Sequence, residues 1–134
     1  RQRQMCIRDR EKILTLTTDA FEFDDARTAS QVEPLEQVID ILVERLRAQH
    51  IKRLKDGACS IDTGVVYLDV LNNVERISDH CSNIAARLVG MEAGEDYDSH
   101  TLKNMMHHNP TKEYMLNYEQ CRKDYLVPLE QLEA

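Results

Sequence analysis

Residues 60–90 read SIDTGVVYLDVLNNVERISDHCSNIAARLVG, and this stretch indicates the class of fold. Its apolar residues recur at steps of three and four, which is the spacing along one face of an α-helix. Ser60 is a typical helix N-cap, and Gly90 is a typical helix stop. We therefore predict a helix over 61–89. Its core stripe is expected to consist of Val70, Val74, Ile77, Cys81, Ile84, Ala85 and Leu88.

A second long helix is predicted upstream, over residues 25–56. Pro34 should kink or restart this helix near Glu33, and Gly57 should end it. Because only residues 57–60 connect the two helices, they should form an antiparallel hairpin. The stripe that this helix turns to the core is expected to be Thr28, Val32, Leu35, Ile39, Leu42 and Leu46.

A first helix is predicted over residues 11–22, followed by Asp24 and Asp25 as a turn and an N-cap. Residues 1–10 (RQRQMCIRDR) do not share its amphipathic pattern. They are either a solvated basic helix start or a non-native segment, and we assign them no function. The predicted core stripe of this helix is Ile13, Leu16, Thr17, Ala20 and Phe21.

The C-terminal part of the chain is predicted to hold one more helix. Turn-forming residues make 91–110 irregular, and a last helix covers 111–126, limited by Pro128. The fold class is therefore all-α: an antiparallel three-helix bundle over residues 11–90. Residues 91–134 supply a loop and a C-terminal helix that packs on the bundle or extends it. Tyr114, Tyr118, Cys121 and Tyr125 share one face of that helix.

The composition excludes several classes of function. The formal net charge of −7 over 134 residues disfavours an electrostatic nucleic-acid binder, which needs a basic surface. The four cysteines form no C-x-x-C pair, so a structural zinc site is not expected. No stretch has the roughly 18 apolar residues that a membrane-spanning helix requires. We expect a reducing compartment, since no secretory signal is present.

Two acidic pairs stand out: Glu36 with Asp40, and Glu75 with Asp79. The members of each pair are four residues apart, so they point to the same side of their helix. In a hairpin that turns near residue 58, Glu36 lies level with Asp79, and Asp40 lies level with Glu75. The mismatch is about one residue, or roughly 1.5 Å of rise. The two stripes must both lean toward the shared groove or both lean away from it.

Four carboxylates at one height predict a metal site made of Glu36, Asp40, Glu75 and Asp79. Oxygen donors suit Mg, Mn, Ca or Fe, and Zn is a further candidate. The alternative is that Glu-x-x-x-Asp pairs arise by chance in acidic helices and stay solvated. We predict no catalytic and no cofactor-binding residue besides these ligands. His80 and Asn83 would make neighbouring or partner contacts, and the adjacent His107 and His108 are interpreted as a chance pair.

Residues 74–85, VERISDHCSNIA, resemble the second acidic motif of the PhoU family, and residues 36–40, EQVID, resemble the first. The amino-acid sequence of residues 32–40 and 78–83 is most similar to the domain at the C-terminus of bacterial sodium/phosphate cotransporters. The resemblance covers residues 11–90. It departs from the family at Ser78, where many relatives have glycine, and in showing one repeat where the soluble members carry two.

The resemblance implies a metal role for Glu36, Asp40, Glu75 and Asp79. It also implies a cytosolic regulatory or accessory domain of a sodium-dependent phosphate transporter, and not an enzyme. Its partner would then be the membrane portion of the same parent protein, and homodimerisation is a second expectation. No nucleic-acid partner is expected. The chain itself would be soluble and would lie at the cytoplasmic face of the cell membrane.

Three other interpretations stay open. One is a free-standing PhoU-like regulator of phosphate signalling. Another is a purely structural docking module, in which Tyr114, Tyr118 and Tyr125 form an interface stripe instead of packing in the core. The remotest is a di-metal hydrolase, which usually adds Glu-x-x-His motifs that this sequence does not contain.

Overall fold

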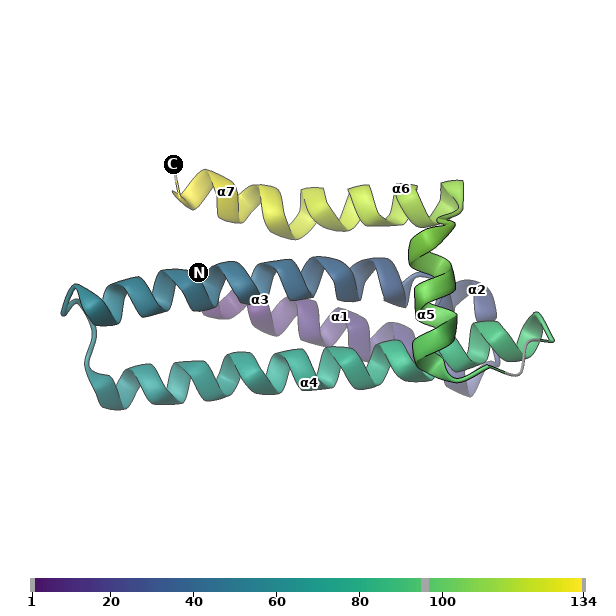
Figure 1. Ribbon diagram of the computed structural model, residues 1–134, viewed down its shortest axis with the longest axis horizontal. Helices are drawn as coiled ribbons and strands as arrows, with labels where there is room; N and C mark the ends of the chain where they lie inside the picture. Colours follow the sequence, from purple (N-terminus) through teal and green to yellow (C-terminus); the bar gives the residue numbers. More distant parts are fainter. Residues whose placement is uncertain (1, 95–96, 134) are drawn as a thin grey trace.

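The computed structural model describes the backbone of residues 2–94 and 97–133, and the side chains of 11–94 and 97–131. These residues form helices and connecting turns, so the all-α prediction is confirmed (Figure 1). The elements in chain order are α1 (Gln2–Glu22), α2 (Ala26–Ala29), α3 (Val32–Lys55), α4 (Ile61–Glu92), α5 (Ser99–His108), α6 (Lys112–Cys121), the π-helical turn η1 (Arg122–Leu126) and α7 (Val127–Glu133).

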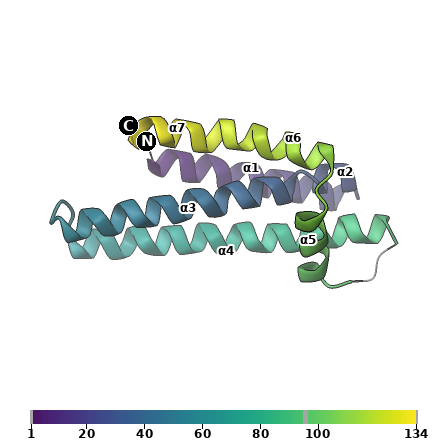
Figure 2. The ribbon, with the colours of Figure 1, turned by 45° about the horizontal axis from the view of Figure 1, so that its top comes forward.

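Four helical rods run side by side along the long axis: α1, α3, α4 and the continuous run of α6, η1 and α7. Helices α3 and α4 form the predicted antiparallel hairpin. Helix α3 contacts α1, α4, α6 and η1, so it is the central rod of the bundle. Helix α5 lies across the others near one end and joins α4 to α6 (Figure 2).

The core follows the apolar stripe of α3, whose predicted members Val32, Leu35, Ile39, Leu42 and Leu46 are fully buried. Each such side chain stabilises the fold by about 1.5–3 kcal/mol relative to an exposed position. The face of α4 differs from the prediction, because this helix packs against both α1 and α3. Its buried residues are Gly64, Leu71, Val74, Ser78, Cys81, Ser82, Ala85, Ala86 and Gly90.

Three residues that the sequence assigned to the core are exposed. Phe21, near the end of α1, is 70% exposed. On α4, Val70 is 41% exposed and Ile84 is 44% exposed, because they lie to one side of the surface that α1 and α3 cover. The prediction for these three residues was wrong.

Two predicted helix starts require correction. Helix α1 begins at Gln2 and not at residue 11, although the side chains of 1–10 lie outside the described set. The predicted helix over 25–56 is two helices. Asp25 caps the short α2 by accepting from the backbone N–H groups of Arg27 and Thr28, and α3 begins at Val32. Pro34 therefore lies in the first turn of α3, where its missing N–H costs no helical hydrogen bond.

Gly57, with φ of +70°, follows α3 as predicted, but Gly90 does not stop α4. Gly90 is buried within the helix, which continues to Glu92 and is followed by Gly94 at φ of +72°. Helix α5 falls inside the segment 91–110 that was predicted to be irregular. Its N-cap is Asp98, whose carboxylate accepts from the N–H of Thr101 at 2.7 Å.

Pro128 does not limit the last helix. In a regular α-helix its ring would clash with the carbonyl of Asp124, four residues earlier. Asp124 lies in the wider π turn η1, and the chain stays helical to Glu133. The face shared by Tyr114, Tyr118, Cys121 and Tyr125 packs toward the core, since each of the four is buried or half-buried.

Candidate functional site

The four predicted carboxylates gather at the groove between α3 and α4. The negative charges of Glu75 and Asp79 raise the pKa of Asp40, and the charge of Asp40 raises the pKa of Glu36. Electrostatic coupling of this kind requires the groups to lie close together. Asp40 therefore lies near both Glu75 and Asp79, which supports the arrangement in which both pairs lean toward the shared groove. The equal height of all four carboxylates remains a prediction.

Glu36 and Asp40 form the inner part of this carboxylate cluster. Burial, followed by the charges of Asp40 and Glu33, raises the pKa of Glu36 to about 9. Burial is also the main reason that the pKa of Asp40 is raised. Near neutral pH the Glu36 carboxyl group keeps its proton and donates it in a hydrogen bond to Asp40. The two carboxyl groups of the inner pair therefore titrate as a coupled pair that shares a proton.

The outer carboxylates are each paired with a cation. Arg47 Nη2 lies 2.9 Å from Glu75 Oε2. Lys103 Nζ, delivered from α5, lies 3.3 Å from Asp79 Oδ1 and 3.3 Å from Asn83 Oδ1. Asn83 was expected to make neighbouring contacts and does so, whereas His80 is exposed.

As they stand, these side chains do not form a metal site. Among the side chains that the structure describes, no group of three or more His, Cys, Asp or Glu is placed to hold a metal ion. The oxygen donors have the right chemistry for a hard cation. However, Glu75 already forms an ion pair with Arg47, and Asp79 forms one with Lys103. Metal ligation by these four residues remains a prediction, and it requires both cations to move.

A cavity of about 300 Å³ opens beside the inner pair, and a second of about 210 Å³ adjoins it along α6. Gln37, His107 and Tyr118 line both cavities. None of these three was predicted as a site residue. The remaining residues around the first cavity are Glu36, Asp40 and Ile41.

Glu33 is a further buried carboxylate that the sequence analysis did not assign to the site. Its side chain is 2% exposed and is held from two sides. The hydroxyl of Ser82 on α4 donates to one carboxylate oxygen, and Nε2 of His107 on α5 lies 2.7 Å from the other. His107 and His108 bond different partners, which agrees with the interpretation of their adjacency as chance, but the contact of His107 with a core carboxylate was not predicted.

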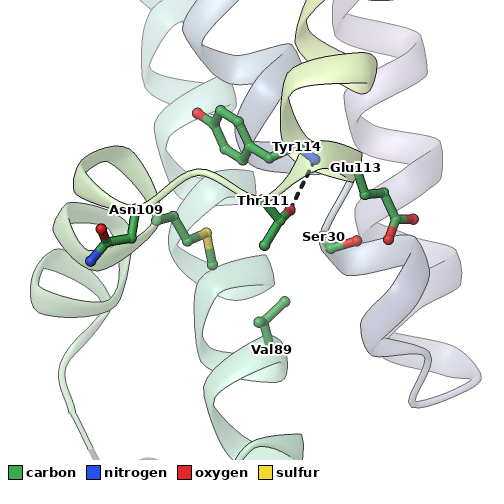
Figure 3. A pocket seen from close by; sticks show the side chains of 7 residues that line it. Ser30, Val89, Asn109, Thr111, Glu113 and Tyr114 are labelled. Carbon is green, nitrogen blue, oxygen red and sulfur yellow. Dashed lines mark hydrogen bonds between the residues drawn. The ribbon is translucent and has the colours of Figure 1, made fainter.

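A third cavity, of about 220 Å³, lies where α2, α4, α5 and α6 meet (Figure 3). Its lining includes one carboxylate, Glu113, which faces Arg27 across 3.8 Å. Thr111 caps α6 by accepting from the N–H of Tyr114, and the Tyr114 hydroxyl donates to Gln37 on α3. With its single carboxylate already facing a cation, this cavity is a weaker candidate than the carboxylate cluster.

Within the described ranges, no helix combines the length and the apolar content needed to cross a membrane.

Comparison with known proteins assigns the hairpin to a family. The profile of the PhoU domain matches residues 8–88. Over 85 residues the chain is 25% identical to the phosphate-specific transport system accessory protein PhoU homolog 1 of Thermotoga maritima. This alignment covers 63% of this chain and 37% of that protein. Over 79 residues it is 34% identical to a PhoU homolog of Streptococcus pneumoniae, covering 59% of this chain and 37% of the relative. The aligned part thus spans little more than a third of either relative. No solved structure matches the chain significantly.

Proposed function

The chain belongs to the PhoU domain family, and on that premise we propose that it is a regulatory or accessory module of phosphate transport. The relatives from Thermotoga maritima and Streptococcus pneumoniae are named as accessory proteins of the phosphate-specific transport system. The observation that carries the proposal is the carboxylate cluster on the α3–α4 hairpin, because the family profile covers this hairpin and all four carboxylates lie within it.

For its context, we propose a domain on the cytoplasmic side of a sodium-dependent phosphate transporter. The resemblance of residues 32–40 and 78–83 to transporter-attached domains supports this choice. A free-standing regulator fits the two relatives equally well. Immunoblotting of fractionated source cells with an antibody against the chain separates the two contexts, because only the first predicts that the antibody detects a membrane-embedded polypeptide much larger than this chain.

A regulatory role is preferred to an enzymatic one because of the order of the groups around Glu33. Hydrolases of the serine type need a base that takes the proton of the serine hydroxyl. Here the Glu33 carboxylate lies between Ser82 and His107, so the histidine does not receive the serine proton. A hydroxyl that donates to a buried carboxylate acts as a structural hydrogen-bond donor.

We further propose that Glu36, Asp40, Glu75 and Asp79 bind a divalent cation after Arg47 and Lys103 withdraw. Thermal melting after chelation, with Mg, Mn, Ca, Zn or Fe(II) added back, tests this role. A ligand that binds only the folded state raises the free energy of unfolding by RT ln(1 + [L]/Kd). We expect a rise of several degrees in Tm with at least one of these ions.

The Asp40→Asn/Asp79→Asn double variant should lose this rise in Tm while remaining helical by circular dichroism. Asp69→Asn, an exposed substitution on the same helix α4, is the matched control and should keep the rise. A flat response to every ion would remove the metal from the proposal and favour a plain docking module. Phosphate uptake in cells that express the parent protein, with and without the double substitution, then tests the regulatory role itself.

A further inference from the structure

Helix α5 is placed differently from the rest of the bundle. It lies across the long helices, whereas the other main helices run along them (Figures 1 and 2). Leu102 is its one side chain that is buried, at 3% exposed, and its main packing partner is α4. A ten-residue helix with a single buried apolar anchor depends on other contacts for its position.

Two of those contacts are charged or polar, and both reach the candidate site. Lys103 extends from α5 to Asp79 and Asn83, at 3.3 Å from each. Its side chain is 14% exposed, although it carries a positive charge. The same charge acts on the inner pair, where it opposes the rise in the pKa of Glu36 and of Asp40. Lys103 is therefore close to three of the four carboxylates.

The second contact is that of His107, one turn further along α5. Its Nε2 lies 2.7 Å from Glu33, and its ring borders the cavity beside Glu36 and Asp40. Residues Lys103 and His107 are four positions apart, so they project from the same face of the helix. That face of α5 is turned to the carboxylate cluster.

We propose that α5 is a strap that closes the carboxylate cluster, with Lys103 as the built-in cation that occupies it. The inference rests on the proposed metal role and adds a mechanism of control to it. When α5 moves away from the cluster, the ammonium group of Lys103 leaves Asp79. When α5 is docked, the same ammonium group excludes an external cation. The strap is thus an autoinhibitory element for whatever cation the cluster accepts.

Two physical points support this competition. A tethered lysine has a high effective concentration at the cluster, so it competes without needing strong individual contacts. Furthermore, a cation that binds only the open form has its apparent affinity reduced by the fraction of molecules that are open. Weaker contacts between α5 and the bundle should therefore increase the affinity of the cluster for a cation, and stronger contacts should decrease that affinity.

The experiment uses the full 134-residue chain and its Lys103→Gln variant. Hydrogen–deuterium exchange reports the opening of α5, and calorimetric titration with Mn²⁺ reports binding at the cluster. Without metal, Lys103→Gln should raise exchange in residues 99–108 by about tenfold, and Mn²⁺ should bind it about tenfold more tightly than the parent chain. Adding Mn²⁺ to the parent chain should also raise exchange in α5. Lys123→Gln, an exposed lysine in η1, is the matched control and should change neither.

The outcomes separate the strap from the metal role. Equal α5 exchange in Lys103→Gln and the parent chain overturns the strap, whether or not Mn²⁺ binds. Faster α5 exchange in the variant, without Mn²⁺ binding by either protein, would show that Lys103 holds α5 in place but would reject the metal role and the autoinhibition that rests on it. If Lys103→Gln does not fold, Asn83→Ala replaces it, because this variant removes the other partner of Lys103 and leaves the lysine in place. A cation affinity unchanged in Asn83→Ala, with unchanged α5 exchange, would overturn the strap as well.

Discussion

Oε1 of Glu33 lies 2.7 Å from Nε2 of His107, although 74 positions separate the two residues in the chain. The other oxygen of the same carboxylate accepts from Ser82. One buried side chain in the first turn of α3 thus ties together α3, α4 and α5. Removing it would leave polar groups of two other helices without this partner.

Glu33 and His107 should therefore be energetically coupled. In a double-mutant cycle with Glu33→Gln and His107→Ala, we expect a coupling free energy of about 1.5–3 kcal/mol, the usual range for a hydrogen bond to a charged group. Denaturant unfolding of the four proteins measures it. His108→Ala is the control, since His108 bonds the carbonyl of Asn104 within its own helix. Strict additivity of Glu33→Gln and His107→Ala would show that the contact contributes nothing.

The raised pKa of Glu36 predicts that stability falls as pH rises. Below about pH 4.5 this group is protonated in both the folded and the unfolded chain. Between pH 4.5 and about 9 the unfolded chain releases its proton first, so the free energy of unfolding decreases across this window. The total decrease should be on the order of a few kcal/mol. Unfolding in guanidinium chloride at a series of pH values measures it.

Glu36→Gln should flatten this pH dependence, because the amide is neutral throughout the window. Glu92→Gln, which changes an exposed carboxylate at the end of α4, should leave it intact. An unchanged pH dependence in Glu36→Gln would mean that another group causes it.

At Gly64 the two hairpin helices approach each other closely near their turn. A Cβ atom at this position would lie 2.7 Å from Leu54 Cδ2 and 3.1 Å from His50 Nε2. The imidazole is held by a hydrogen bond to the Gly64 carbonyl oxygen, so it cannot easily move aside. We expect Gly64→Ala to cost about 1–3 kcal/mol despite the better helix propensity of alanine. Thermal or denaturant unfolding measures the loss.

The Leu54→Ala background separates this clash from other causes. Removing the leucine methyl groups clears the nearest contact, so Gly64→Ala should cost less there than in the parent chain. The same cost in both backgrounds would exclude the clash with Leu54.

Tyr114 should ionise at a higher pH than a tyrosine in water. Burial, followed by the negative charges of Glu33 and Glu36, raises the pKa of its phenol well above the usual value. Absorbance titration should show a tyrosine that ionises late, and Tyr114→Phe should remove that late phase. Because the hydroxyl donates to Gln37 Oε1 at 2.7 Å, the substitution should also cost about 0.5–1.5 kcal/mol. The exposed Tyr97→Phe serves as the control, and a late phase that survives in Tyr114→Phe would contradict the assignment.

The hairpin and its carboxylates could be predicted because they depend on local rules. Helical periodicity gave α3 and α4, and the short turn at 57–60 gave their antiparallel pairing. Once both were known, the level of Asp40 relative to Glu75 followed from the rise per residue. The domain assignment of residues 11–90 and the metal role remain predictions.

Helix α5 could not be predicted in the same way. It is only ten residues long with Leu102 as its single buried side chain, and the turn-forming residues around it favoured a loop. The partners of Lys103 and His107 lie on other helices, so their roles appear only when the crossing of α5 is known. The burial of Glu33 was equally hidden, because a glutamate beside a proline is usually exposed.

The π turn η1 has a consequence for how this chain can change in length. A π turn contains one residue more than an α turn, so it is an insertion that the helix has absorbed. Deleting one residue from Arg122–Leu126 would remove the wider turn and leave the residues beyond it on the same faces, so Leu129 would stay buried. The deletion would, however, place Pro128 in a regular α-helix, where its ring clashes with the carbonyl four residues earlier. Pro128, and not the register of the last helix, therefore makes the extra residue necessary.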